Sequence, residues 1–168
     1  NGTSHYYVVK FMESRVSIRK LENKDVEAVS ELCMASFSKS VAASLSEEGV
    51  ATFSKIAASD AFHHRMTEDN VMLVAQCDGK IEGVIELKEG RHVAMLFVDP
   101  DRQMKGVGRE LLASALTYVR VDTVTVSASL SSVAAYKKYG FECKGDVAES
   151  VGLIYQPMQI ELKAIKQS

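Results

Sequence analysis

The segment 103–109 has the residue types and spacing expected of a phosphate-binding turn. Gly106 and Gly108 lack a Cβ atom, so a ligand can approach the backbone closely and meet its free N–H groups. An amphipathic helix is predicted directly after the turn, and the N-terminal end of a helix attracts anions. Lys105 and Arg109 add positive charge to a chain whose formal net charge is −2. We therefore predict that a phosphate or pyrophosphate binds here.

Two common phosphate-binding motifs do not fit this turn. The Rossmann fingerprint needs a third Gly or Ala, but position 111 is Leu. The P-loop needs Lys and then Ser or Thr after its second glycine, but Gly108 is followed by Arg109 and Glu110. A loop that needs glycine for its geometry alone is the alternative interpretation.

Hydrophobic periodicity predicts the elements that surround this turn. The first strand lies around Val16 and Ile18, and Asn23 is the expected N-cap of a helix that reaches Phe37. Ser44 and Glu47 form a capping-box pattern, so a second helix is expected from there towards His63. Three strands over 71–75, 81–87 and 92–98 follow, and an Asp-Gly turn joins the first two. A helix over 107–119, a strand over 124–128, a short helix over 131–139 and two strands over 141–144 and 153–162 complete the chain.

This order of elements, β-α-α-β-β-β-α-β-α-β-β, predicts an α/β (α+β mixed) fold with helices packed on a sheet. We expect residues 1–168 to form a single domain with an ordered core of about 14–164.

The composition excludes several classes of protein. A pI of about 6.1 is unlike the basic excess of nucleic-acid binders, so no nucleic acid is expected as a partner. No apolar run approaches the roughly 20 residues that span a bilayer, so no membrane association is expected. The first ten residues have no signal-peptide layout. Three scattered cysteines, Cys33, Cys77 and Cys143, argue against disulfides and structural zinc. We expect them to be small buried hydrophobic residues in a cytoplasmic protein.

Two segments resemble signatures of the GNAT superfamily of N-acetyltransferases. Gln103-x-x-Gly106-x-Gly108 resembles its Q/R-x-x-G-x-G/A signature, and Tyr136-x-x-x-Gly140-Phe141 resembles its Y-x-x-x-G-F segment. The resemblance extends over about residues 16–162. It implies the GNAT fold, whose central sheet is mixed and mostly antiparallel, with six to seven strands and helices on both faces.

The resemblance also implies acetyl-CoA as the cosubstrate and no metal. In the family, amides of the phosphate-binding turn hold the pyrophosphate of coenzyme A, and the fourth strand offers backbone groups to its pantetheine arm. Carried to this sequence, the turn residues are Gln103, Met104, Lys105, Gly106, Val107, Gly108 and Arg109, and the strand residues are Leu96, Phe97 and Val98. Ser127 stands where the family often has an Asn that helps to seat the cofactor.

Tyr136 is the residue that the resemblance assigns as the general acid. In many family members the tyrosine at this position protonates the departing thiolate, and a phenol with a pKa of about 10 is protonated at neutral pH. The alternative is that Tyr136 only packs, as we expect for its neighbour Tyr139.

Two residues are candidates for the general base. His92 occupies the position at which one branch of the family has a catalytic glutamate, and Glu86 lies on the preceding strand. His92 is alternatively an ordinary polar residue at the start of a strand, and many family members use only ordered water. The adjacent His63 and His64 point in different helical directions, so they are a poor pair of metal ligands.

The sequence therefore predicts an N-acetyltransferase that moves an acetyl group from acetyl-CoA to a primary amine by direct attack in a ternary complex. The acceptor stays open between small amines, polyamines, aminoglycosides, amino acids and the amines of proteins or peptides. A coenzyme A-binding regulatory or interaction module without turnover is the alternative, and a nucleotide-binding module is a third. Dimers are common among the proteins that the chain resembles, so a homodimer is also open.

Overall fold

The strands of the protein form a mixed sheet. The computed structural model describes residues 16–103 and 105–162. Its strands are β1 (Ser17–Lys20), β2 (Asn70–Cys77), β3 (Lys80–Lys88), β4 (His92–Val98), β5 (Thr123–Ala128), β6 (Glu142–Cys143), β7 (Ala148–Ser150) and β8 (Leu153–Glu161). Their order is β1-β2-β3-β4-β5-β8-β6, and β7 also pairs with β8. β4 and β5 run parallel, whereas the other pairs among these strands are antiparallel. The predicted fold class is confirmed, but over the described residues the sheet has eight strands rather than six to seven, because the three-residue β7 was not foreseen.

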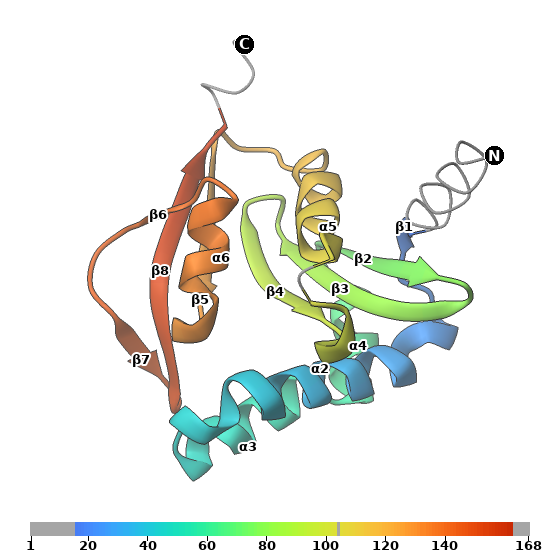
Figure 1. Cartoon of the computed structure of the whole chain (residues 1–168), viewed down its shortest axis with the longest axis horizontal. Coiled ribbons are helices and arrows are strands. Elements are labelled where there is room, and N and C mark those ends of the chain that lie inside the picture. The colour runs from blue at the N-terminus through green and yellow to red at the C-terminus, as the bar shows by residue number, and fades with distance from the viewer. Residues whose placement is uncertain (1–15, 104, 163–168) are drawn as a thin grey trace, which may run out of the picture.

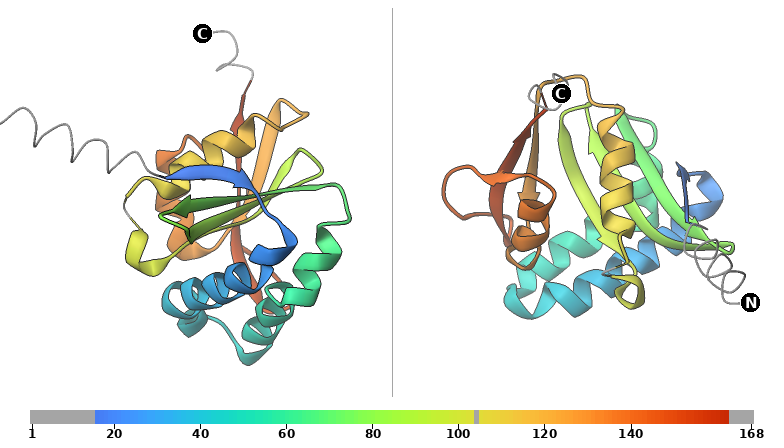
Figure 2. Two further views of the ribbon diagram at one scale, coloured as in Figure 1. Left: turned by 90° about the vertical axis from the view of Figure 1, so that its right-hand side faces the viewer. Right: turned by 45° about the horizontal axis from the view of Figure 1, so that its top comes forward.

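Helices cover both faces of this sheet. α2 (Val26–Ser40), α3 (Glu47–Ile56) and α4 (Ser59–Arg65) lie on one face, and α5 (Val107–Leu116) and α6 (Val133–Lys138) lie on the other (Figures 1 and 2). Alternate residues of a strand point to opposite faces. Leu73 of β2 therefore packs in one hydrophobic cluster with Leu111, and Val74 packs in a second cluster with Val29. The sheet thus separates two cores.

The parallel pair β4 and β5 parts soon after it forms. Only two pairs of residues are in register, His92 with Thr125 and Val93 with Val126. Beyond them, β4 continues along β3 to Val98, and β5 continues along β8 to Ala128. The two strands diverge in Figure 1. Each strand therefore has an edge in the middle of the sheet whose backbone groups do not pair with the other strand.

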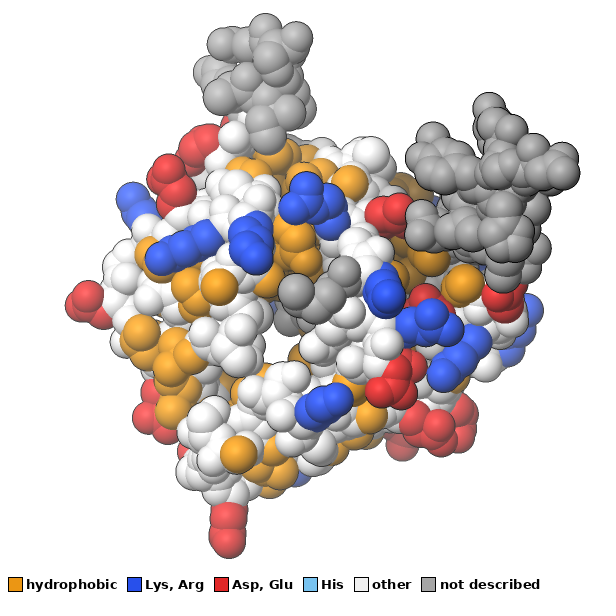
Figure 3. All heavy atoms as spheres, viewed as in Figure 1, with side chains coloured by type: hydrophobic (Ala, Val, Ile, Leu, Met, Phe, Trp, Pro, Cys, Tyr) orange, Lys and Arg blue, Asp and Glu red, His pale blue; other side chains and the backbone are white. Residues whose placement is uncertain are grey.

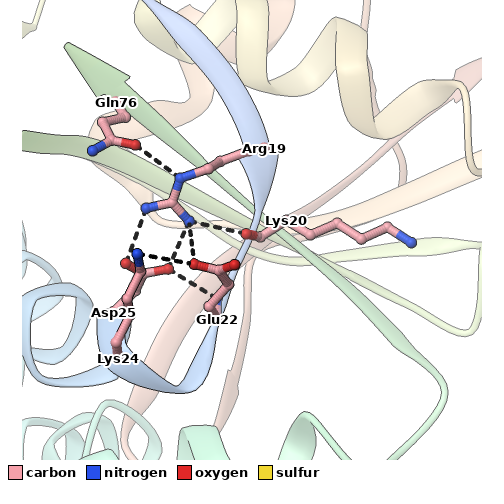
Figure 4. Close-up of polar contacts among 6 residues, drawn as sticks. All are labelled: Arg19, Lys20, Glu22, Lys24, Asp25 and Gln76. Carbon is pink, nitrogen blue, oxygen red and sulfur yellow. Dashed lines mark hydrogen bonds and ion pairs between the residues drawn. The ribbon is translucent and has the colours of Figure 1, made fainter. Parts of the chain in front are cut away.

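Arg19 fastens the edge strand β1 to the rest of the fold. Its guanidinium donates to both carboxylate oxygens of Asp25, at 2.7 and 3.0 Å, and its Nε donates to Gln76 Oε1 at 2.8 Å (Figure 4). Asp25 is 5% exposed, and the hydrogen bonds from Arg19 lower the pKa of its carboxyl group. This cluster joins β1, β2 and the start of α2.

The predicted helix boundaries need three corrections. Asn23 is not an N-cap, because it lies in a 3-10 turn and α2 begins only at Val26. Ser46 rather than Ser44 caps α3, since its Oγ accepts from the N–H of Gly49 at 3.2 Å. The second predicted helix is broken between Ile56 and Ser59, so its last part is the separate helix α4.

The cysteines differ in burial. Cys33 is fully buried as expected, but Cys77 is half-buried and Cys143 is exposed. Cys143 lies on the two-residue strand β6 at the end of the sheet, where little chain covers it. In the described part of the chain, no helix has the length and apolar character needed to cross a membrane.

α3 and the turn between β7 and β8 are in direct backbone contact. A Cβ atom on Gly49 would collide with the carbonyl oxygen of Gly152, and a Cβ atom on Gly152 would collide with the backbone of Gly49. Thr52 Oγ1 also donates to the carbonyl of Val151 at 2.7 Å. These contacts hold the β7–β8 hairpin against α3.

We predict that Gly49→Ala destabilises the protein. The added methyl group forces the backbones apart, and such overpacking costs about 1–3 kcal/mol, or roughly 2–12 °C in Tm for a domain of this size. Differential scanning fluorimetry of the variant measures the change. In a solvent-exposed helix the same substitution stabilises by about 0.5–1 kcal/mol, so a rise in Tm would show that the contact is absent.

Candidate functional site

The loop between β4 and α5 is anchored to β3 at its start. The N–H of Asp99 donates to the carbonyl of Glu82 at 2.8 Å, and Arg102 Nε lies 3.0 Å from Glu82 Oε1. The side chain of Glu82 is 3% exposed, so this ion pair is shielded on the carboxylate side. The loop therefore approaches the helix from a fixed position.

α5 begins in the way that an anion site requires. Gly106 has a φ of +82°, a left-handed conformation that favours glycine, and no side chain caps the helix there. The first bond within the helix runs from the N–H of Glu110 to the carbonyl of Gly106, at 3.1 Å. The amides of residues 107–109 therefore have no acceptor within α5. Met104, which was expected to contribute to the turn, lies outside the described residues.

Glycine is needed at position 108 for a different reason, because a tyrosine at the end of α6 approaches the backbone closely there. A Cβ atom at Gly108 would lie 2.8 Å from the hydroxyl of Tyr139. The guanidinium of Arg109 lies 5.9 Å from the centre of the same ring. Tyr139 is thus a packing residue, and it joins the first signature segment to the second.

A cavity of about 190 Å³ lies where β4 and β5 diverge. Figure 3 shows the face of the molecule hollowed near its centre, at this position. Four of the predicted residues line it: Leu96, Phe97, Ser127 and Tyr136. The cavity is also lined by Phe37, Val41, Phe53, Ile56, Val93, Ala94, Met95, Val126, Ala128, Ser129, Ser132, Leu153, Ile154 and Tyr155. It therefore connects the strand edges with α2, α3 and β8.

The hydrogen bonds of β4 direct two of its amides away from β3. Asp99 donates to β3, and the direction of bonding alternates along an antiparallel strand, so Phe97 also bonds to β3. The peptide groups of Leu96 and Val98 consequently face the divergence from β5. A weak hydrogen bond supports this orientation, since Gln103 Nε2 donates to the carbonyl of Val98 at 3.4 Å.

The second signature segment forms a Schellman motif, which ends α6. The N–H of Phe141 donates to the carbonyl of Tyr136 at 2.9 Å, and the N–H of Gly140 donates to that of Lys137 at 3.0 Å. Gly140 has a φ of +103°. The rings of Tyr136 and Phe141 make the hydrophobic contact typical of this motif, with their centres 5.3 Å apart. The motif requires a glycine and two apolar residues, but it does not use the tyrosine hydroxyl.

Tyr136 is nearly buried at the wall of the cavity. Its side chain is 5% exposed, and it contacts Tyr139 edge to face at 6.0 Å between ring centres. Burial, with a smaller contribution from Tyr139, raises the pKa of the phenol above its usual value. Tyr136 is therefore protonated at neutral pH, and its ring is held by packing on two sides.

Two serines that sequence reasoning missed also line the cavity. Ser129 and Ser132 follow β5, and the Ser129 hydroxyl donates to that of Ser132 at 3.0 Å. The Ser132 hydroxyl in turn donates to the carbonyl of Ser129 at 2.8 Å. The run Ser129-Leu130-Ser131-Ser132, directly after a predicted strand, was the available signal.

Glu86 does not line the cavity. Both of its carboxylate oxygens accept from Arg65 Nε at 3.0 Å, and Arg65 also donates to the carbonyl of Ile56 at 2.9 Å. Glu86 is 2% exposed, and burial raises the pKa of its carboxyl group although Arg65 opposes the shift. The pair joins α4 and the end of α3 to β3, so the carboxylate of Glu86 holds these elements together.

His92 likewise lies away from the cavity lining. Its Nδ1 is 2.7 Å from the hydroxyl of Thr125, which joins β4 to β5 at the point where the two strands still pair. Burial lowers the pKa of the imidazole, with smaller contributions from Arg91 and Lys88. His92 is therefore neutral at pH 7. It lies where β4 and β5 are still paired, just before the two strands separate.

Basic side chains are exposed on the side of the sheet that carries α5 and α6. Lysine and arginine side chains surround the hollow in Figure 3. The exposed basic residues of these two helices and of the loop before α5 are Arg102, Lys105, Arg109, Lys137 and Lys138. The described residues include no group of three or more His, Cys, Asp or Glu arranged to hold a metal. The site thus offers amides, hydroxyls and positive charge.

This arrangement of strand divergence, glycine turn and tyrosine is that of an acetyltransferase domain. The family model of the acetyltransferase (GNAT) domain matches residues 41–162, and the chain belongs to this family. A GCN5-related N-acetyltransferase from Rhodopseudomonas palustris is similar in structure, with a TM-score of 0.76 over 89% of this chain and 97% of that one, at 24% identity.

Two further relatives concern the cofactor and the acceptor. The putative acetyltransferase yncA from Salmonella typhimurium, solved with its cofactor acetyl-CoA, has a TM-score of 0.65 over 89% of this chain and 95% of that one, at 21% identity. The peptidyl-lysine N-acetyltransferase YjaB from Salmonella typhimurium is 38% identical over 60 residues. That match spans 35% of this chain and 41% of the relative.

We predict that His92 makes the stability of the protein depend on pH. Folding lowers the pKa of His92. The contribution of His92 to stability is therefore full above the unfolded pKa of about 6.5, and it is lost as the pH falls towards the lower folded pKa. Between pH 7.5 and pH 5, the Tm of His92→Gln should fall less than the Tm of the original protein. The exposed His63→Gln serves as the control and should follow the original curve. Equal pH profiles for all three proteins would contradict the prediction.

Proposed function

We propose that the protein transfers the acetyl group of acetyl-CoA to a primary amine by direct attack in a ternary complex. The observation that carries this proposal is the cavity at the divergence of β4 and β5, which brings Tyr136 together with β4 residues whose amides face the open side. Acetyl-CoA supplies the activated acyl group. The residues of the chain bind and orient the two substrates and exchange protons with them.

The turn before α5 suits the pyrophosphate of coenzyme A. The amides of Val107, Gly108 and Arg109 have no acceptor within the helix, and the positive end of the helix dipole coincides with them. The exposed basic residues beside these amides favour binding of the negatively charged phosphates of coenzyme A. The relative yncA was solved with acetyl-CoA, which supports the same donor here.

The amides of Leu96 and Val98 suit the pantetheine arm and the thioester. In the proposed complex, one of them donates to the thioester oxygen, on which negative charge develops as the amine nitrogen bonds to the carbonyl carbon. A preorganised donor in a site of low dielectric stabilises such charge strongly. Leu96 lines the cavity, so its amide is our choice for this role.

Tyr136 returns a proton to the sulfur atom. When the carbon–sulfur bond breaks, the sulfur leaves as a thiolate, and the phenol of Tyr136 protonates it. Burial raises the pKa of this phenol, so it carries its proton throughout the neutral range. Solvent then restores the proton to Tyr136.

Water is our proposed acceptor for the proton that the substrate ammonium loses. Neither His92 nor Glu86 lines the cavity, and each is already bonded, to Thr125 and Arg65 respectively. This supports the ordered-water alternative over a dedicated base.

We predict that Tyr136→Phe lowers kcat by about 10²-fold or more, the usual contribution of general acid catalysis. The phenyl ring keeps the contact with Phe141, so the fold and the affinity for acetyl-CoA should be retained. Steady-state thiol release measures the rate, and calorimetry measures acetyl-CoA binding. Tyr139→Phe is the matched control and should keep most of the activity. An unchanged kcat in Tyr136→Phe would exclude the general-acid role.

We also predict that acetyl-CoA stabilises the protein against heat. A ligand at 100 times its Kd adds about 2.7 kcal/mol, which is roughly 5–11 °C in Tm for a domain of this size. ATP, which has a polyphosphate but no pantetheine, is the control and should produce a much smaller shift. The absence of any shift at millimolar acetyl-CoA would contradict the proposed function.

A further inference from the structure

The wall of the cavity on the side of α2 and α3 is built from aromatic rings. Phe37 of α2 and Phe53 of α3 stack with their centres 3.9 Å apart and an angle of 12° between the planes. Phe97 of β4 meets Phe53 edge to face at 5.3 Å. All three phenylalanines line the cavity. They form a continuous apolar surface beside the proposed position of the thioester.

This aromatic wall lies on the acceptor side of the site. The glycine turn and the exposed basic residues belong to the side of α5 and α6, so the pantetheine arm enters from there. α2 and α3 pack on the opposite face of the sheet (Figure 2). The amine must approach the thioester from the direction that the arm does not occupy, so it meets Phe37, Phe53 and Phe97.

The cavity has no acidic partner for a second positive charge. None of the described residues that line it is charged. The three buried carboxylates among the described residues lie elsewhere in the fold and are already paired: Glu86 with Arg65, Asp25 with Arg19 and Glu82 with Arg102. A second ammonium group drawn into this cavity would lose its hydration without gaining a counter-charge, which is strongly unfavourable.

The volume of the cavity limits the size of the acceptor. About 190 Å³ is only slightly more than the roughly 150 Å³ cavity that accommodates benzene in a protein core. The cavity is open to the surface on one side, so the thioester end of the donor lies at its mouth in the proposed complex. The enclosed part holds a single ring.

We propose that the acceptor is a primary arylalkylamine, in which a single uncharged aromatic ring is joined to the amine by a short chain. Phe37, Phe53 and Phe97 hold the ring, and the hydroxyl-lined end near Tyr136 receives the amine. This inference rests on the proposed acetyltransferase function and narrows its acceptor. It excludes polyamines, which the sequence alone left open.

The experiment compares 2-phenylethylamine with putrescine and spermidine as acceptors, by thiol release from acetyl-CoA with the full chain. We expect kcat/KM for 2-phenylethylamine to be about 100-fold higher, the scale on which an apolar pocket discriminates. Acetylation of putrescine or spermidine at an equal or higher kcat/KM would overturn the acceptor class while leaving acetyl transfer established. Binding of acetyl-CoA without acetylation of 2-phenylethylamine would overturn it as well. Absence of any thermal shift with acetyl-CoA would instead refute the proposed function on which the inference rests.

Two variants connect the preference to the aromatic wall. Phe53→Leu should raise KM for 2-phenylethylamine about tenfold and leave KM for acetyl-CoA unchanged, since an apolar contact is reduced only on the acceptor side. Val41→Asp places a carboxylate on the half-buried end of the cavity wall. It should raise the rate with putrescine relative to 2-phenylethylamine, and an unchanged ratio would contradict the inference. The acetyl-CoA thermal shift of each variant verifies that it is folded.

Discussion

The structure depends on a parallel strand pair that holds together over only two pairs of residues. His92 and Val93 pair with Thr125 and Val126, after which β4 follows β3 and β5 follows β8. Unpaired backbone N–H and C=O groups are costly away from water, so an open edge in the middle of a sheet requires partners. Here the edge borders a cavity, and the proposed pantetheine arm is such a partner. The early separation of β4 and β5, which weakens the sheet, is therefore also what opens the cavity of the candidate site.

The parts around this divergence are held before any ligand binds. Glu82 and Arg102 anchor the loop before α5, and Gly108 admits the hydroxyl of Tyr139 from α6. The Schellman motif fixes the end of α6 and orients Tyr136. A site whose donors are already in place loses less entropy on binding and needs less reorganisation during the reaction. Both signature segments thus have structural reasons for their glycines, and the Tyr136 hydroxyl is the feature that structure alone does not require.

The features that the sequence predicted are those with local causes. The glycine turn, the Asp-Gly turn and the two strands that it joins, β2 and β3, depend on neighbouring residues, and all three are found in the structure. Partners distant in sequence could not be inferred. Glu86 and Arg65 are separated by 21 residues, and His92 and Thr125 by 33, so only the fold shows that each side chain already has a partner. The serines after β5 and the aromatic wall were missed for the same reason, because a cavity is a property of packing.

The separation of the two cores by the sheet has a consequence for how such proteins diverge. The cluster around Leu111 supports the proposed donor side, whereas the cluster around Val29 and Phe53 supports the proposed acceptor side. Residues more than about 7–10 Å apart that share no partner contribute nearly additively to stability. Mutations that reshape the face of α2 and α3 are therefore largely independent of those that preserve the opposite face. During evolution, a lineage with this fold can change its acceptor in small steps while selection keeps the donor site intact.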